Sequence, residues 1–451
     1  MTWWTNAETF HASTYGNDWG VNGHFDWGPL AQSRFTFTTH CPIDKNFIDR
    51  CHQMGVRCFP YISFYFGPKL CTFGPITSNT YEGVDFSQHP EFFEWGPDLQ
   101  PRPWVFGTGI PDGVGVFFPE PDPPYVPCVT CPNYLPYQEE MVAWVEYIMQ
   151  QGADGIFVDN IVKRRHCYAP HAHIYTGVDS EPDPDLAQNQ AFTLLLSKIR
   201  AVVKSYQPNG LVLGNTGDPL GLITGQTWPA FQQYLDSDCI EDYVCEGPRT
   251  DLWQNRLKWD DLGQQLQAYL AQGKQILAFS GLQGTAKPGT FDTQLREDAF
   301  FCYCSARVAG LTWYGGPMNA VEVGDLHRVR LGNPLGSETS DATGQVKYRV
   351  FEHGIVAINW DKTNAHTFQP QNPVTTAGAP IPPIPEFLYD LFAGGFTNVD
   401  RNATDGLVQV PANSGRVFLF GASTDYGLNR LSAPGTVAAA SSLEEVMAGV
   451  R

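Results

Sequence analysis

The order of β-rich and helical segments constrains the fold of this chain more than any other feature. From about residue 34 to 320, short runs rich in β-branched and aromatic residues alternate with segments of helical periodicity. This order is typical of a parallel sheet whose strands are connected by helices. The predicted strands are residues 34–39, 56–66, one near 104–118, 154–159, 211–215, 239–247, 275–281 and 311–316.

Eight parallel strands are the number at which such a sheet closes into a barrel. We therefore predict an α/β fold, a (β/α)8 TIM barrel over residues 1–324, with a long loop insertion at about 67–135 that is rich in Pro, Gly and aromatic residues. Loops of this length in a compact domain are usually functional. An open, doubly wound sheet is the alternative for the same order of elements.

The pattern changes beyond residue 324. The segment "VKYRVFEHGIVAINWDK" alternates apolar and polar residues, and the Pro-rich segments that follow it have no helical periodicity. We predict a C-terminal antiparallel, β-sandwich-like domain at residues 325–423 and a tail at 424–451.

Charge and hydropathy exclude several classes of partner. The net charge of −19, from 47 acidic and 28 basic residues, repels nucleic acid and anionic lipid. No window reaches 18 uninterrupted apolar residues, and the N-terminal residues lack the basic start and apolar centre of a signal peptide. We expect no nucleic-acid and no membrane partner. The sequence indicates neither the oligomeric state nor the compartment, which is secreted or periplasmic if a signal peptide was removed and cytoplasmic otherwise.

Polar side chains end several of the predicted strands. Asp159 ends "GADGIFVD", Asn215 follows "LVLG", and Glu246 follows "DYVC". In a barrel the carboxyl ends of the strands form the active face, so these groups point towards a common pocket. A single acid at the end of a strand is equally consistent with a helix N-cap and with a catalytic group. Two acids at the ends of different strands favour a shared catalytic site.

Two carboxylates across a pocket are the machinery of glycoside hydrolysis. One stabilises or attacks the oxocarbenium-like carbon, and the other protonates the leaving oxygen. Asp159 fits the first role and Glu246 the second. Two alternatives stay open: a non-catalytic barrel in which these acids bind sugar hydroxyls, and a metal-dependent barrel lyase or isomerase.

The segment "CPNYLPYQEEMVAWVEYIMQQGADGIFVDN" resembles the part of barrel glycoside hydrolases in which a helix precedes strand four and that strand ends in the catalytic aspartate. An aspartate on strand four with an acid on strand six is similar to the dextranase, α-glucosidase and α-galactosidase type of barrel. The resemblance implies that Asp159 is the nucleophile or stabilising carboxylate and that Glu246 is the acid/base.

Candidate substrate-binding residues end the predicted strands or lie in the loops beside them. Aromatic residues make up 13% of the chain, and aromatic faces are a common platform for sugar rings. An oligo- or polysaccharide is therefore the expected substrate. Asp218 is equally consistent with a residue that only stabilises a turn. Arg249 is equally consistent with a surface salt bridge. The full set is Tyr61, Trp104, Asn160, His166, Asn215, Asp218, Arg249, Trp313 and Tyr314.

The cysteines and histidines do not form a recognisable metal motif. Cys128 and Cys131 have CxxC spacing, but no second CxxC follows. His171 and His173 lie in the loop "HCYAPHAH", where an H-x-H pair needs further ligands from elsewhere in the fold. We therefore assign no metal ligand and expect no cofactor.

Overall fold

The computed structural model describes residues 9–12, 27, 35–63, 90–94, 130–176, 185–216, 229–240, 267, 269–280, 293–315, 321–370, 384–385, 387–398 and 408–421. The chain divides into two compact units, which are described separately below. Unit 1 comprises residues 1–37 and 240–451, and unit 2 comprises residues 38–239.

Eight strands form one sheet in which their order follows the chain. The pairs β3–β4, β4–β5, β5–β6 and β7–β8 are parallel. This curled parallel sheet confirms the predicted α/β fold of the TIM-barrel type. The strands are β1 (His11–Ala12), β2 (Phe37–Cys41), β3 (Arg57–Ser63), β4 (Gly155–Asp159), β5 (Leu211–Gly214), β6 (Ser237–Ile240), β7 (Gln275–Ser280) and β8 (Thr312–Gly315).

The eight strands of the sheet are not the same eight that the sequence predicted. The expected strand near residues 104–118 lies outside the described residues, and β3 pairs directly with β4 through Tyr61↔Phe157 and Ser63↔Asp159. β3 and β4 are therefore neighbours in the sheet. The additional strand is β1, which is two residues long and too short to show a periodicity in the sequence. Close by in unit 1, Thr9 forms a parallel bridge with Trp313 of β8.

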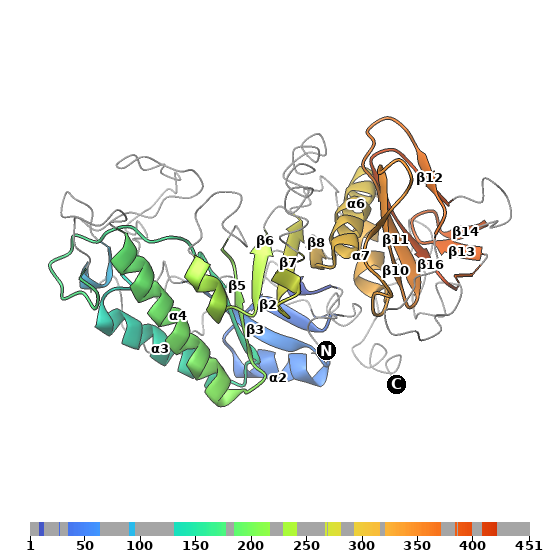
Figure 1. Cartoon of the computed structure of the whole chain (residues 1–451). Coiled ribbons are helices and arrows are strands. Elements are labelled where there is room, and N and C mark those ends of the chain that lie inside the picture. Colours follow the sequence, from blue (N-terminus) through green and yellow to red (C-terminus); the bar gives the residue numbers. More distant parts are fainter. Residues whose placement is uncertain are drawn as a thin grey trace, which may run out of the picture. The chain divides into compact units, whose positions relative to one another are not determined.

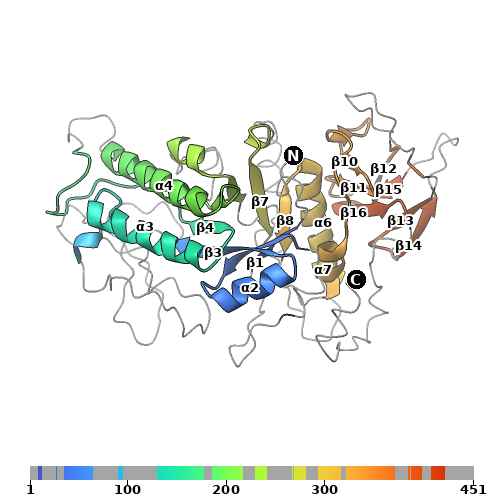
Figure 2. The same cartoon turned by 90° about the horizontal axis from the view of Figure 1, so that it is seen from below.

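Unit 2 carries the helices α2 (Lys45–Gln53), α3 (Leu135–Gln150) and α4 (Leu186–Tyr206) and the 3-10 turns η4 (Pro90–Phe92) and η5 (Pro229–Tyr234). The side chain of Asp44 caps α2 by accepting a hydrogen bond from the Phe47 amide at 2.7 Å. Figures 1 and 2 show α3 and α4 side by side. The turn η5 ends at Tyr234, and β6 begins three residues later at Ser237.

The core of unit 2 lies between the neighbouring strands β4 and β5 and the two long helices, with α3 against β4 and α4 against β5. The apolar residues of β4 are completely buried, and α3 and α4 bury one face each. Each such side chain contributes about 1.5–3 kcal/mol when it leaves water. This packing fixes β4, and with it the side chain at the end of β4. The residues concerned include Ile156, Phe157, Val158, Met141, Trp144, Val145, Ile148, Leu195, Leu196 and Ile199.

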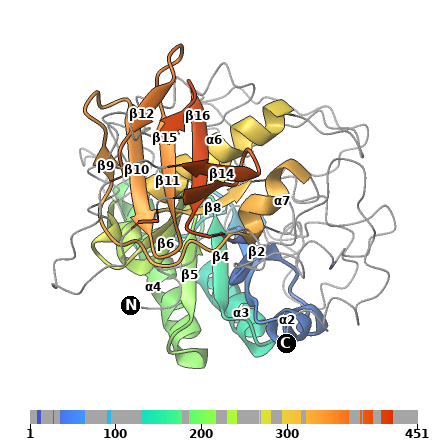
Figure 3. The same cartoon turned by 90° about the vertical axis from the view of Figure 1, so that its right-hand side faces the viewer.

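Unit 1 contains the helices α6 (Thr293–Ala309) and α7 (Val321–Arg328). It also contains a six-stranded antiparallel sheet with the strand order β14-β13-β16-β11-β10-β9. The central strands of this sheet run side by side in Figure 3. This sheet confirms the predicted C-terminal β fold. Helix α6 packs against β8 and also against β11 and β16. The predicted boundary at 324/325 stays a prediction. The strands are β9 (Thr339–Ser340), β10 (Val346–Phe351), β11 (Gly354–Asn359), β13 (Phe387–Asp390), β14 (Gly395–Asn398) and β16 (Ser414–Leu419), with β12 (His366–Phe368) and β15 (Val408–Val410) as a separate pair.

None of the helices in the described part of the chain is both long enough and apolar enough to cross a bilayer.

The start of β4 provides a test of the sheet. Gly155 has a φ of +151°, and a Cβ atom at this position would overlap the backbone carbonyl oxygen and amide of Leu211 on β5. Because backbone atoms of a paired strand cannot move aside, we expect Gly155→Ala to lower the free energy of unfolding by at least about 3 kcal/mol. Urea denaturation measures this change.

Gly273→Ala is the matched control. Gly273 also has a positive φ, +76°, but no atom lies within 4 Å of an added Cβ. This variant should lose about 1 kcal/mol, the conformational strain alone. Equal losses in the two variants would contradict the close β4–β5 approach.

Candidate active site

Asp159 ends β4, and its carboxylate accepts four hydrogen bonds. Oδ1 accepts from the Asn160 amide and from Nδ2 of Asn215, both at 2.8 Å. Oδ2 accepts from Nδ2 of Asn160 at 2.8 Å and from the hydroxyl of Tyr61. All four donors are neutral and come from β3, from the residue after β4 and from the residue after β5. A carboxylate has about four lone-pair sites, so every site is used.

The register of the sheet explains why these groups meet. Tyr61 pairs with Phe157, and Asp159 lies two residues further along β4 and therefore on the same face. The ring of His40, on β2, lies 5.0 Å from that of Tyr61 and 4.3 Å from that of Phe157. Asn215 directly follows β5, the next strand. Parallel strands thus bring the predicted residues Tyr61, Asp159, Asn160 and Asn215 together.

Asn160 adopts a left-handed backbone conformation, with a φ of +58°. Asparagine is one of the residues that tolerate this region. The turn lets both the backbone amide and the side-chain amide of Asn160 donate to Asp159, while Nδ2 also lies 3.2 Å from Oγ of Ser63. Unusual backbone conformations of this kind cluster at functional sites.

Burial raises the pKa of Asp159 above its ordinary value, because the charged form loses its hydration. The hydrogen bonds from Tyr61, Asn160 and Asn215 act in the opposite direction and lower the pKa, by less than burial raises it. The carboxylate is half-buried. Because the four donors are uncharged dipoles, they stabilise the negative charge of the ionised Asp159 without neutralising it.

Asp238, in β6, is a second carboxylate held in the same way. It is fully buried and accepts hydrogen bonds from the Thr216 amide at 3.0 Å, the Thr216 hydroxyl at 2.7 Å, the Cys239 amide at 2.7 Å and Nε2 of Gln232. Burial raises its pKa to about 6. Since Thr216 follows Asn215 in the chain, one two-residue segment donates to both buried acids.

Asp236, by contrast, is part of a structural ion pair. Both of its carboxylate oxygens lie 2.8 Å from guanidinium nitrogens of Arg200 on α4. Its Oδ2 also accepts from the Val212 amide on β5 at 2.9 Å.

Trp313 and Tyr314, the predicted residues of unit 1 that the structure describes, lie in packed surroundings. Trp313 is fully buried, its Nε1 donates to Oγ of Ser280 at 3.0 Å, and its ring stacks on that of His327 at 5.1 Å. Tyr314 is buried against the rings of Phe10 and Phe279. Contacts of these two residues with a substrate stay a prediction.

His166 follows β4 and is partly buried in the loop of unit 2. Its ring contacts that of Tyr168 edge-on at 4.5 Å, and its backbone amide donates to Asp185 at 2.6 Å. A substrate contact for His166 likewise stays a prediction. Trp104, Asp218, Glu246 and Arg249 lie outside the described residues.

The segment before α3 and the loop after β4 together form a second group of chemically active side chains that sequence patterns did not reveal. Cys131, Cys167, His171 and His173 lie close together and form the one group of possible metal ligands found among the described residues. The available signal was the density of Cys and His in "HCYAPHAH". Cys131, which lies before α3, could not be assigned to this group without the fold.

Comparison with known proteins gives a fold and no closer relative. No family model matches the chain, and no curated protein matches it. Among solved structures, Amy13B of Eubacterium rectale has a TM-score of 0.51 at 10% identity, over 92% of this chain and 96% of that one. The trehalose-6-phosphate hydrolase TreA of Bacillus licheniformis has a TM-score of 0.50 at 9% identity, over 93% and 100%. At these identities the likeness concerns the fold alone, which is of the TIM-barrel type with a C-terminal antiparallel sheet.

Asp238 makes the stability of the protein depend on pH. Its folded pKa, about 6, exceeds the ordinary value of 3.8, so its contribution to stability is complete below about pH 4 and is lost as the pH rises through 6. A shift of about two units corresponds to about 3 kcal/mol. Asp238→Asn lacks this titration. Between about pH 4 and pH 8, we therefore expect the unfolding free energy of the wild type to fall by about 3 kcal/mol relative to that of Asp238→Asn. Urea titrations at several pH values measure it, and a constant difference would contradict the assignment.

Proposed function

We propose that the protein is a glycoside hydrolase or transglycosylase that cleaves glycosidic bonds of an oligo- or polysaccharide by a two-carboxylate mechanism. The observation that carries this proposal is the carboxylate of Asp159, fixed at the carboxyl end of β4 by four neutral donors. In barrels of this type the active site lies at that end of the strands. The fold likeness to glycoside hydrolases supports the same conclusion.

Asp159 acts on the anomeric carbon in this proposal. Cleavage of the glycosidic bond builds positive charge on that carbon, and a carboxylate whose donors are all neutral keeps its full negative charge to stabilise it. Tyr61 and Asn215 hold the two oxygens in place, so the group needs no reorientation during the reaction. Tyr61, Asn160 and Asn215 are positioning residues in this role and also candidate contacts for sugar hydroxyls.

Glu246 is the proposed acid. It transfers a proton to the glycosidic oxygen as the bond to the anomeric carbon breaks. If the two carboxyl groups are about 5–5.5 Å apart, Asp159 forms a covalent glycosyl intermediate, and Glu246 then removes a proton from the water that hydrolyses it. At about 6.5–9.5 Å, water attacks the anomeric carbon directly and Asp159 removes its proton. Neither route requires a cofactor. Trp104, His166, Asp218, Arg249, Trp313 and Tyr314 complete the proposed substrate site.

Amide substitutions test the catalytic pair. Asp159→Asn and Glu246→Gln keep the size of each side chain but remove the charge or the transferable proton. We expect each to lower kcat on a cleaved glycan by at least about 10³-fold, which is within the range for loss of a proton-transfer or nucleophilic group. A screen of defined glycans identifies the substrate, and NMR of the first product reports its anomeric configuration.

Asp154→Asn is the matched control at the opposite end of β4. Asp154 accepts hydrogen bonds from the Cys58 amide at 2.9 Å and lies 2.8 Å from Nε2 of His52. Its loss should lower stability and leave kcat within about threefold. Wild-type turnover in Asp159→Asn would contradict the proposal.

A second candidate is a barrel that binds a saccharide without cleaving it. The observation favouring it is that all four lone-pair sites of Asp159 are occupied, as in a carboxylate that only orders its neighbours. This candidate predicts that a glycan binds to the wild type with no product, and that Asp159→Asn weakens binding. Calorimetry and product analysis on the same glycan distinguish the two.

Tyr61→Phe tests the positioning of Asp159. The substitution keeps the ring that packs on Phe157 but removes a hydrogen bond that lowers the pKa of Asp159. We expect the acidic limb of the kcat profile to move to higher pH and kcat to fall about tenfold. Tyr206→Phe, which removes an exposed hydroxyl on α4 that accepts from Gln150, should change neither. An unchanged pH profile in Tyr61→Phe would exclude this positioning role.

A further inference from the structure

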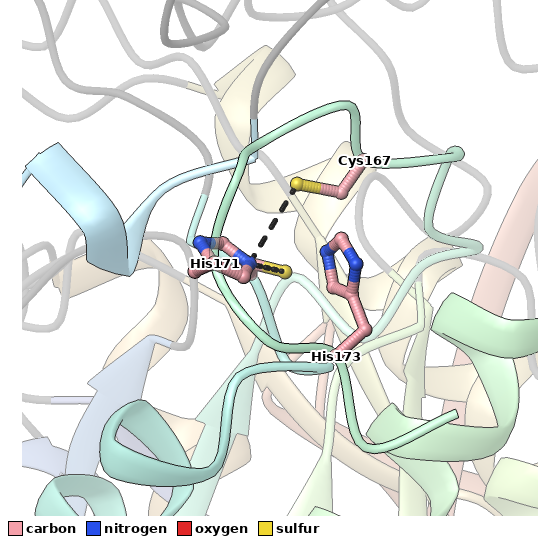
Figure 4. Close-up of side chains that lie close together, drawn as sticks. Cys167, His171 and His173 are labelled. Atoms are coloured by element: carbon pink, nitrogen blue, oxygen red, sulfur yellow. Dashed lines mark hydrogen bonds between the residues drawn. The ribbon is translucent and has the colours of Figure 1, made fainter. Parts of the chain in front are cut away.

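Two thiols and two imidazoles converge in the loop that follows β4. One donor atom from each of Cys131, Cys167, His171 and His173 lies within 4.8 Å of the other three, and we call this group the Cys2His2 cluster. Nε2 of His171 lies 3.3 Å from Sγ of Cys131 and 4.0 Å from Sγ of Cys167. Figure 4 shows the imidazoles of His171 and His173 on either side of the space beside Cys167.

The spacing of these donors suits a tetrahedral metal ion. With zinc–sulfur bonds of about 2.3 Å and zinc–nitrogen bonds of about 2.0–2.1 Å, the edges of such a tetrahedron are about 3.3–3.8 Å long. One nitrogen–sulfur separation already has this length, and the others, all within 4.8 Å, need adjustments of about 1.5 Å at most. Rotations of the side chains suffice for such shifts, so the backbone can stay in place.

The chemical nature of the donors selects the metal. Thiolates and imidazoles are the ligands of Zn²⁺, whereas Ca²⁺ and Mg²⁺ prefer oxygen. Four protein ligands close the coordination sphere, as in structural zinc sites. Nε2 of His173 is buried and has no hydrogen-bond partner within the described part of the chain, and a buried polar atom of this kind is rare unless it has a ligand.

The surrounding structure holds the two contributing segments in place. The Cys131 amide donates to the Phe92 carbonyl at 2.7 Å. Tyr134 and His173 form an antiparallel bridge, and the Ile174 amide donates to the Asn133 carbonyl at 2.9 Å. Gln188 of α4 lies beside Cys131, with Nε2 at 3.5 Å from Sγ, as a partner that orients a metal-bound thiolate.

We propose that Cys131, Cys167, His171 and His173 bind one Zn²⁺ ion in a closed tetrahedral site. The ion would join the segment before α3 to the loop after β4, which begins at Asn160 beside Asp159. The site is structural, since no position is left for water or substrate. The proposal does not depend on the proposed hydrolase activity.

Metal analysis of the full-length protein tests the site. Protein purified with a reductant and without chelator should contain about one zinc per chain by mass spectrometry of the metal. After removal of the metal, addition of ZnCl2 should raise Tm by several degrees, because a ligand that binds only the folded state stabilises it. Co²⁺ in place of zinc should give the intense visible bands and the thiolate-to-metal absorption of a tetrahedral cysteine site.

Single variants separate a metal site from a packing cluster. His173→Ala and Cys167→Ala should weaken zinc binding at least about 100-fold, since even the loss of an outer-shell partner costs about 10–100-fold. His173 is partly exposed, so this variant should fold. Cys304→Ala, which removes a buried thiol of α6, is the matched control and should keep full zinc content.

Three results would overturn the proposal. These are a folded wild type that takes up less than about 0.1 zinc per chain, an affinity that is unchanged in His173→Ala, and a Cys131–Cys167 disulfide in protein prepared with reductant. Circular dichroism of each variant shows that loss of zinc does not result from unfolding.

Discussion

The burial of carboxylates without cations is the constraint on which unit 2 depends. A carboxylate that leaves water without hydrogen bonds loses several kcal/mol, so Asp159 and Asp238 are stable only where donors converge on them. Eight hydrogen bonds from neutral donors meet this requirement, four for each acid. The strands that supply the donors are thereby fixed in register at their carboxyl ends, which is also where a barrel enzyme carries out its chemistry.

The same arrangement connects stability with function. Packing of α3 on β4 and of α4 on α3 and β5 places Asp159, and the left-handed turn at Asn160 gives that residue two donors to one carboxylate. Such a group is held in one orientation, which in the proposed function lets it stabilise an oxocarbenium-like transition state without reorienting. The raised pKa that results from burial is the energetic consequence of this placement.

The parts of the fold with strong local signals could be predicted from the sequence. Strands β4, β7 and β8 are continuous apolar runs, and each begins and ends within about one residue of the predicted strands 154–159, 275–281 and 311–316. Asp159 could be identified because a carboxylate that ends an apolar strand contradicts the local pattern. Its neighbours Tyr61 and Asn215 could be named for the same reason, since each lies at or near the end of a strand.

Features that depend on contacts between distant segments could not be predicted. The pairing of β3 with β4 and the two-residue β1 have no signal in a single segment, which is why a strand near residues 104–118 was expected. Cys131 and His173 lie on different segments, which the bridge between Tyr134 and His173 and the hydrogen bond from Ile174 to Asn133 bring together. Neither CxxC nor H-x-H spacing describes this group, because its ligands combine one residue from before α3 with three from after β4.

The measurement that tests the central claim most directly is the distance between the carboxyl carbons of Asp159 and Glu246 in an experimental structure that resolves both side chains. A two-carboxylate glycosidase requires about 5–9.5 Å, with both groups open to the same pocket. A separation above about 12 Å, or a Glu246 side chain enclosed in an ion pair away from solvent, would contradict a hydrolytic role for this pair.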